Sequence, residues 1–177
     1  MDASTYLEGI QAMLLEDFNA AAPSELAAIL TPCLDIQRWV AEIIAARPFN
    51  DLADLLTCAR TIAEPFTAEE VAQAMVHHPR IGERALGASA EASLSRQEQA
   101  AVDPQDAAVI TALAEGNRNY EEKFDQVFLI RAAGRSSQEI IDILRQRMSN
   151  TATQENLIVA QQLREIAVLR LEGMMSA

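Results

Sequence analysis

The chain has 177 residues, and its 26 acidic residues against 14 basic ones give it a formal net charge of −12. This acidic excess argues against nucleic acid and anionic membranes as partners, because both bind proteins through clustered Lys and Arg. No apolar run reaches the roughly 20 residues of a membrane span, and no secretory leader opens the chain. We therefore expect a soluble, cytoplasmic protein with a single domain over residues 1–177.

The composition predicts an all-α fold. Half of the residues are apolar, helix formers such as Ala, Leu and Glu dominate, and clusters of β-branched residues are scarce. The spacing of the apolar residues predicts a bundle of about eight helices. Cys33 and Cys58 both lie inside apolar runs, which favours buried free thiols in a reducing compartment.

Apolar residues that recur every three to four positions predict five helices in the N-terminal part of the chain. Their expected positions are residues 4–15, a short helix from Glu25, a helix that starts at Thr31 and ends before Arg47, residues 51–64, and residues 68–77. Ser24 and Asn50 are candidate N-caps for two of them. Thr67 and Glu70 have the capping-box spacing, in which each side chain bonds the backbone N–H of the other residue.

The two histidines of the chain, His77 and His78, stand side by side at the end of the fifth predicted helix. Pro79 disfavours helical backbone at His78, so we expect the His78 ring to leave the helix lattice. Because histidine changes its charge near neutral pH, His78 is a candidate general acid or base. Two alternatives remain: both histidines cap the helix C-terminus, or both bind one metal ion, which adjacent helical positions about 100° apart disfavour.

A stretch rich in Gly, Ala and Ser covers residues 79–94 and is predicted to be a long loop, which is often functional. After it, Ser95 and Glu98 have capping-box spacing and predict a short helix. In such a capping box, the Glu98 carboxylate accepts the Ser95 backbone N–H. A carboxylate beside a histidine can instead hold the ring and raise its basicity. Both roles stay open for Glu98.

Three more helices are predicted in the C-terminal part: a long one from Asp103 through Phe124, one from Ser136 to about Met148 that begins with a capping box, and a last one after Asn150. Between the first two, residues 127–131 contain a strand-like run that is too short and isolated to build a sheet. This run is predicted to be an extended connector whose backbone groups need other partners. On the last helix Arg164 and Arg170 could face solvent, but Arg170 stands between two leucines and could reach inward.

Several motifs are absent from the sequence. It has no Gly-x-Gly-x-x-Gly fingerprint, Walker loop, Gly-x-Ser-x-Gly elbow or Cys-x-x-Cys pair. An enzyme built on this chain is therefore expected to work without a nucleotide, flavin or metal.

An ordered set of motifs resembles the family of 2-oxo-4-hydroxy-4-carboxy-5-ureidoimidazoline (OHCU) decarboxylases, enzymes of urate breakdown. The resemblance covers nearly the whole chain and is carried by these stretches: Cys33-x5-Trp39, Arg47-Pro48-Phe49, His78-Pro79-Arg80-Ile81-Gly82-Glu83, Ser95-Arg96-Gln97-Glu98-Gln99, Asn117-x-x-Tyr120-x-x-Lys123-Phe124, Phe128-Leu129-Ile130, Gly134-Arg135-Ser136 and Ile166-Ala167-x-Leu169-Arg170-Leu171.

The resemblance implies an all-helical, commonly dimeric enzyme that converts OHCU to (S)-allantoin and carbon dioxide without a cofactor. It implies that His78 is the catalytic histidine, that Glu98 is its partner, and that Arg170 binds substrate. It also implies a substrate pocket lined by Pro79, Ser95, Gln99 and the backbone of Phe128, Leu129 and Ile130.

The chain departs from the family pattern at two positions. Asp125 stands where the family usually has Gly, and Gly116 stands where it commonly has Leu. These departures and the acidic composition support an alternative function, a non-catalytic helical interaction module or an inactive relative. A metal-dependent hydrolase that uses His77 and His78 is a further alternative.

Overall fold

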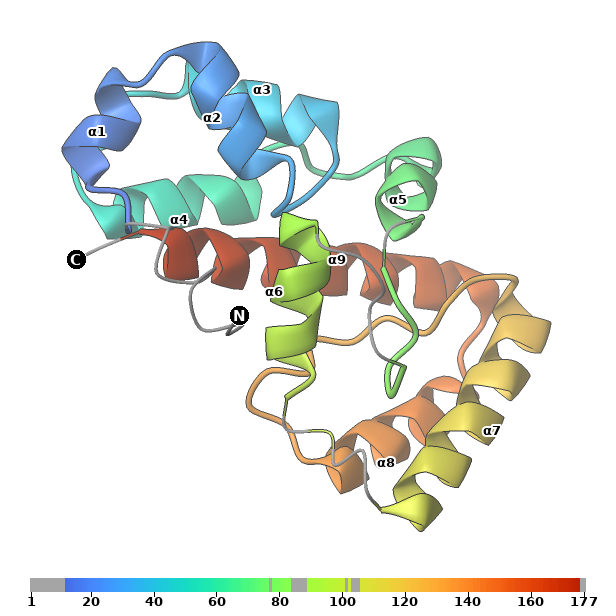
Figure 1. The fold of residues 1–177 in the computed structure, drawn as a ribbon. Coiled ribbons are helices and arrows are strands. Elements are labelled where there is room, and N and C mark those ends of the chain that lie inside the picture. The colour runs from blue at the N-terminus through green and yellow to red at the C-terminus, as the bar shows by residue number, and fades with distance from the viewer. Residues whose placement is uncertain (1–11, 77, 84–88, 101, 103–105, 176–177) are drawn as a thin grey trace. The chain divides into compact units, whose positions relative to one another are not determined.

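The computed structural model describes residues 12–76, 78–83, 89–100, 102 and 106–175, and this part of the chain is all-α (Figure 1). It contains no sheet, and an isolated bridge joins Met13 to Met175. The helices are α1 (Leu15–Ala20), α2 (Pro23–Leu30), α3 (Gln37–Ala45), α4 (Leu52–Thr61), α5 (Ala68–Met75), α6 (Ala90–Glu98), α7 (Ala107–Phe124), α8 (Ser137–Arg147) and α9 (Ala152–Met174). Among the described helices, none has the length and apolar character needed to cross a membrane.

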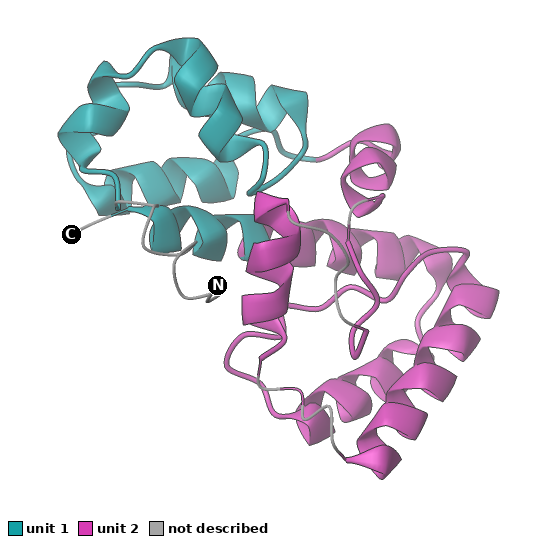
Figure 2. Ribbon diagram, viewed as in Figure 1, with its two compact units in different colours: residues 1–65, 166–177 teal, residues 66–165 magenta. Residues whose placement is uncertain are grey.

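Two compact units make up the chain, and α9 contributes to both (Figure 2). Unit 1 consists of Met1–Pro65 and Ile166–Ala177, and unit 2 consists of Phe66–Glu165. Each unit has its own buried apolar residues, and the two are described separately below.

Unit 1 packs α1 to α4 and the end of α9 around large apolar side chains. Trp39 is fully buried, and its indole N–H donates to the Ala59 carbonyl at 2.9 Å, so the polar atom of this side chain is satisfied. The other large side chains with no exposed surface in this unit include Phe18, Leu26, Leu30, Ile43, Leu55 and, on α9, Leu171. Of the two free thiols, Cys33 is buried as predicted, whereas Cys58 is only half-buried. Burial and the neighbouring Asp54 and Glu42 carboxylates raise the pKa of the Cys58 thiol.

Several helix starts in unit 1 differ from the sequence predictions. α2 begins at Pro23, and Ala22 rather than Ser24 is its N-cap, because proline fits the first helical position and the Glu25 carboxylate accepts the Ala22 N–H at 3.1 Å. Asp51 rather than Asn50 caps α4, accepting the Asp54 N–H at 2.8 Å.

The predicted helix from Thr31 begins later, at Gln37. The Thr31 hydroxyl instead donates to the Ala27 carbonyl at 2.7 Å and closes α2. Residues 4–11 of the predicted helix over residues 4–15 lie outside the described residues. The prediction is wrong for residues 12–14, which are not helical, and α1 begins at Leu15.

In unit 2, α7, α8 and the connector between them enclose an apolar core. Its buried members include Leu113, Tyr120, Phe128, Ile140, Ile141 and Leu144. The capping boxes predicted at Thr67 and Ser136 are both present at the starts of α5 and α8. These caps satisfy backbone N–H groups that the first helical turn leaves without partners.

The two departures from the family pattern lie on α7. Asp125, its C-cap, has φ = 53° and so adopts the left-handed conformation. Glycine adopts this conformation without cost and aspartate tolerates it, so the backbone here suits the Gly of the pattern. Gly116 lies where α7 meets α8, and a Cβ atom added there would lie 2.7 Å from Leu144 Cδ2.

Gly116→Leu is therefore expected to destabilise the protein, although leucine is the better helix former. Overpacking typically costs about 1–3 kcal/mol, and Leu144→Ala alone should cost about 2–5 kcal/mol. In the double variant the new leucine can occupy the space that Leu144 leaves, so the two losses should not add. Urea denaturation of the four proteins measures this coupling. If the two losses of unfolding free energy add exactly, contact with Leu144 is not the reason that Gly116→Leu destabilises the protein.

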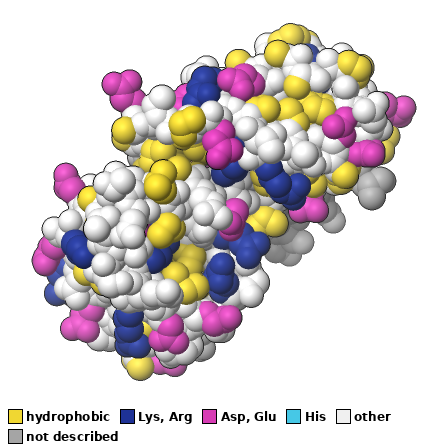
Figure 3. All heavy atoms as spheres, turned by 180° about the vertical axis from the view of Figure 1, so that it is seen from behind, with side chains coloured by type: hydrophobic (Ala, Val, Ile, Leu, Met, Phe, Trp, Pro, Cys, Tyr) yellow, Lys and Arg dark blue, Asp and Glu magenta, His cyan; other side chains and the backbone are white. Residues whose placement is uncertain are grey.

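The face of the protein in Figure 3 carries charges of both signs. On the face in Figure 3, Lys and Arg side chains lie among Asp and Glu side chains, without a continuous region of one sign. The exposed ion pairs of the described residues include Arg38–Glu42 at 3.8 Å and Arg145–Asp142 at 3.4 Å. Each such pair typically contributes less than about 1 kcal/mol.

Candidate active site

The loop with His78 follows α5 directly. Val76 is the C-cap of α5, and the His78 N–H donates to the Met75 carbonyl at 3.2 Å. The predicted end of this helix, at His77, lies outside the described residues. His78 and Pro79 are half-buried. The sequence prediction that His78 leaves the regular helix is confirmed, since α5 ends at Met75.

α6 contains the predicted site residues Ser95 and Glu98, and Gln99 is its C-cap. The start of this helix corrects the sequence interpretation. The N-cap is Ser89, which accepts the Ala92 N–H at 3.1 Å. Ser95 lies inside the helix with 3% of its surface exposed, so the predicted Ser95 capping box is wrong. The end of the predicted loop, from residue 90 to 94, is helical because its alanines favour helix. Glu98 is the last helical residue and has no N-cap role there.

Ser95, Glu98 and Gln99 recur at the i, i+3 and i+4 spacing that places side chains on one helix face. Gln99 is the C-cap of α6. Its side-chain oxygen accepts the Gly82 N–H at 3.0 Å. This bond joins the C-terminal end of α6 to the loop of His78, so two of the predicted site segments meet in unit 2.

Two contacts with α7 hold the same loop. The Asn117 side-chain amide donates to the Ile81 carbonyl at 2.9 Å. Arg80 makes a forked contact with Glu121, from Nε at 2.5 Å and from Nη2 at 2.8 Å. The hydrogen bond to the Glu121 carboxylate raises the pKa of Arg80, and the same bond lowers the pKa of Glu121.

The connector between α7 and α8 forms neither helix nor strand, as the sequence predicts, and its side chains Phe128, Leu129 and Ile130 are buried. Side chains hold two of its backbone groups. Arg147 Nη1 donates to the Leu129 carbonyl at 2.6 Å. The Arg131 N–H donates to the Gln162 side-chain oxygen at 2.9 Å.

Arg147 belongs to a buried ion pair that the sequence interpretation missed. It is 5% exposed, Glu155 is 0% exposed, and Arg147 Nε donates to Glu155 Oε1 at 2.7 Å. The Tyr120 hydroxyl and the Asn150 amide also donate to this carboxylate, at 2.5 and 2.9 Å. Burial opposes ionisation of Glu155, but these hydrogen bonds outweigh it and lower the pKa of Glu155. Burial and the bond to Glu155 raise the pKa of Tyr120.

The spacing of buried residues along α8 and α9 could have predicted this ion pair. Arg147 continues the buried stripe of Ile140 and Leu144 on α8, and Glu155 begins the stripe of Val159 and Leu163 on α9. A charged residue on each of two apolar stripes predicts a buried ion pair, because an isolated buried charge is very costly.

The two candidate arginines of α9 lie in different units. Arg170 lies in unit 1 with 3% of its surface exposed, and its Nη1 donates to the Pro32 carbonyl at 3.0 Å. It thus reaches inward, as one of the two sequence interpretations expects. Arg164 lies in unit 2, where its guanidinium stacks on the Phe66 ring at 4.1 Å.

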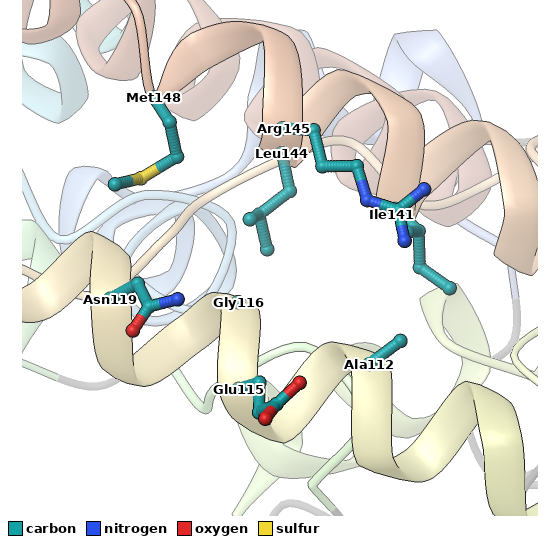
Figure 4. Close-up of a pocket in the computed structure, with 8 residues that line it drawn as sticks. All are labelled: Ala112, Glu115, Gly116, Asn119, Ile141, Leu144, Arg145 and Met148. Carbon is teal, nitrogen blue, oxygen red and sulfur yellow. The ribbon is translucent and has the colours of Figure 1, made fainter.

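A pocket of about 170 Å³ lies between α7 and α8 in unit 2 (Figure 4). Leu144 and Ile141 of α8 face Gly116 and Ala112 of α7 across it, and Glu115 and Arg145 add charged groups to its wall. None of the predicted site residues lines this pocket. Within the described ranges, no group of three or more His, Cys, Asp or Glu side chains is placed to hold a metal ion.

Comparisons with known proteins agree in one family. A family model described as OHCU decarboxylase matches residues 19–172. The chain is 24% identical over 161 residues to the uric acid degradation bifunctional protein of Bacillus sp. (strain TB-90), a match over 90% of this chain and 32% of that protein. The chain therefore spans about a third of the length of this curated relative.

Two solved structures share the fold. A crystal structure of an OHCU decarboxylase in the presence of (S)-allantoin matches with a TM-score of 0.63 and 23% identity, over 83% of this chain and 96% of that one. A crystal structure of an (S)-allantoin synthase matches with a TM-score of 0.65 and 15% identity, over 92% of this chain and 54% of that one.

Proposed function

The chain belongs to the OHCU decarboxylase family, and on this premise we propose that it converts OHCU to (S)-allantoin and carbon dioxide. The family match carries the proposal, because residues 19–172 contain every residue of the candidate site. The same match extends over both compact units, which supports the proposal that they form one functional domain.

The chemistry of OHCU suits a site built only from protein groups. The substrate has a carboxylate on a carbon that also bears a hydroxyl, beside a conjugated C=N bond. When the bond to the carboxylate breaks, carbon dioxide leaves and the electron pair moves into the C=N system. The ring nitrogen that receives this electron pair takes up a proton. The hydroxyl then loses its proton as the ring carbonyl forms, and the neighbouring carbon, the new stereocentre, gains one, so the reaction of the carboxylate takes up one proton in all. The protein needs to orient the substrate and transfer protons.

In the proposed site His78 transfers a proton at the hydroxyl or at the new stereocentre, and Glu98 holds its ring. Because Ser89 rather than Ser95 is the N-cap of α6, Glu98 does not act as a capping-box residue for Ser95. Pro79, Ser95 and Gln99 line the substrate pocket.

For Arg170, the role that the family resemblance implies is to bind polar groups of the substrate through a forked contact. The backbone of residues 128–130 binds the ureido group. Its peptide groups are suited to this role because the connector belongs to no sheet.

A stereospecific assay tests the proposed activity. OHCU is made in situ from urate with the two preceding enzymes, and circular dichroism follows the appearance of (S)-allantoin. The protein should accelerate the (S) form above the spontaneous reaction, and no acceleration would contradict the proposal. Thermal stabilisation by allantoin without acceleration would support the alternative, a non-catalytic binding module.

We also propose that the protein forms a homodimer, as the family resemblance implies. Light scattering in solution should give about twice the chain mass of 19.4 kDa. A monomer mass at micromolar concentration would contradict this proposal.

A further inference from the structure

We propose that Arg147 and Gln162 are positioning residues that orient the backbone N–H and C=O of Ile130 toward the ureido group of the substrate. This inference rests on the proposed function. It concerns residues of unit 2 only, and neither residue is among the sequence-predicted site residues.

The first half of the inference follows from the planarity of the peptide unit. The Leu129 carbonyl and the Ile130 N–H belong to one trans peptide, so they point in opposite directions. Arg147 Nη1 holds this carbonyl at 2.6 Å. Arg147 therefore fixes the Ile130 N–H so that it points away from the guanidinium.

The second half follows from the next peptide. The Ile130 carbonyl and the Arg131 N–H also belong to one trans peptide. The Gln162 side-chain oxygen accepts that N–H at 2.9 Å, so the Ile130 carbonyl points away from Gln162. Each backbone group of Ile130 is thus oriented by a side chain bonded to the opposite end of its peptide unit.

Arg147 can hold this geometry because its other contacts leave it little freedom. Glu155 binds its Nε at 2.7 Å and also contacts Nη2, and its guanidinium lies 4.5 Å from the centre of the Phe128 ring. Tyr120 donates to the same carboxylate and packs edge-on against Phe128, with ring centres 5.1 Å apart. Because an arginine fork is planar and rigid, these contacts set the direction of Nη1.

A ureido group needs both a donor and an acceptor, because it has a carbonyl oxygen and N–H groups. The N–H and C=O of one oriented residue supply this pair without a charged side chain. Backbone groups held in advance bind more tightly than groups that must be ordered by the ligand. The orientation of the Ile130 backbone groups therefore supports both the affinity for the substrate and the selectivity for compounds with a ureido group.

Gln162 is easier to test than Arg147. It is a half-buried residue of α9, so its replacement need not unfold the chain. Gln162→Leu removes the acceptor for the Arg131 N–H at nearly unchanged size. One hydrogen bond corresponds to a roughly 3- to 10-fold effect on affinity. We expect KM for OHCU to rise by that factor while kcat changes less than about twofold, because the ureido contact is made equally before and during the reaction.

Two variants serve as controls. Gln162→Glu keeps an acceptor oxygen and should keep KM within about twofold of the wild type. Gln161→Leu changes the neighbouring exposed residue, whose amide donates to Glu165 at 3.1 Å, and should leave both constants unchanged. A wild-type KM in Gln162→Leu, or equal damage in Gln162→Leu and Gln162→Glu, would overturn the inference.

Arg147→Lys tests the other peptide. Lysine keeps the positive charge for Glu155 but not the fork that also reaches the Leu129 carbonyl, so KM should rise even where the variant is fully folded. A folded Arg147→Lys with wild-type KM would overturn this half. An inactive wild-type protein would overturn the proposed function itself, and it is seen before any variant is compared.

Discussion

Replacement of His78 by alanine is expected to lower kcat about 100- to 10,000-fold, the usual contribution of a general acid–base group. The ring is half-buried at the start of the loop, so its removal should leave the protein folded. Steady-state kinetics by circular dichroism measures the loss, and thermal denaturation checks the fold. Val76→Ala, at a 71% exposed position two residues earlier, is the matched control and should keep the wild-type rate.

Glu98→Gln then separates a partner of His78 from an independent catalytic group. If Glu98 acts only by holding the His78 ring, its loss should cost a similar factor, and the double variant should be no slower than His78→Ala alone. Multiplied losses in the double variant would show that Glu98 acts on the substrate directly. Wild-type activity in His78→Ala would remove His78 from the mechanism.

Glu155→Gln is expected to lower the free energy of unfolding by about 3–5 kcal/mol at pH 7, because it leaves the buried Arg147 without its counter-charge. Chemical denaturation measures the loss. Removing both charges, in Arg147→Met with Glu155→Leu, should cost less than Glu155→Gln alone, since no unpaired charge remains buried. A larger cost for the double variant would show that packing rather than charge dominates here.

The effect of Glu155→Gln should also depend on pH in a definite direction. The pKa of Glu155 in the folded chain lies below its ordinary value of 4.5. The stability that this ionised group contributes is therefore complete above about pH 4.5 and is lost as the pH falls through the folded value. The difference between wild type and Glu155→Gln should shrink below pH 4.5. A constant difference from pH 7 to pH 3 would contradict the assigned ionisation.

The helical content of the chain was predictable, whereas some helix starts were not. The boxes at Thr67 and Ser136 follow residues that do not favour helix, so the pattern and the structure agree. Ser95 has the same spacing but follows an alanine-containing stretch that already prefers helix, and Ser89 takes the cap. A capping pattern therefore indicates a start only where the preceding residues cannot extend the helix.

Burial on the long helices was only partly predictable from spacing. Leu157 belongs to the apolar pattern of α9, yet it is 68% exposed. The spacing of apolar residues identifies the apolar face of a helix, but it does not show how much of that face other elements cover. Glu155 lies two residues before Leu157 and is fully buried. Its spacing from Val159 and Leu163 indicates burial, but the local pattern does not identify all three of its partners, Arg147, Tyr120 and Asn150.

The sequence names members of a candidate site, but it does not reveal the contacts that hold them in place. The family resemblance names His78 and Glu98, and these assignments stay predictions that the kinetic variants test. The contacts that hold the site, such as Gln99 with Gly82 and Gln162 with Arg131, join residues far apart in the sequence. No spacing rule relates such residues, so only the folded structure reveals them.

The loop of His78 is bonded to α6 through Gln99 and to α7 through Asn117 and Glu121. The conformational entropy of residues 80–82, which make these contacts, is therefore lost when the protein folds and not when substrate arrives. Fixing a residue's backbone costs about 1–2 kcal/mol, so ordering even these three residues on binding would consume much of the affinity for a small ligand. A chain that orders them in advance can use the binding energy of its substrate to lower the barrier of the reaction.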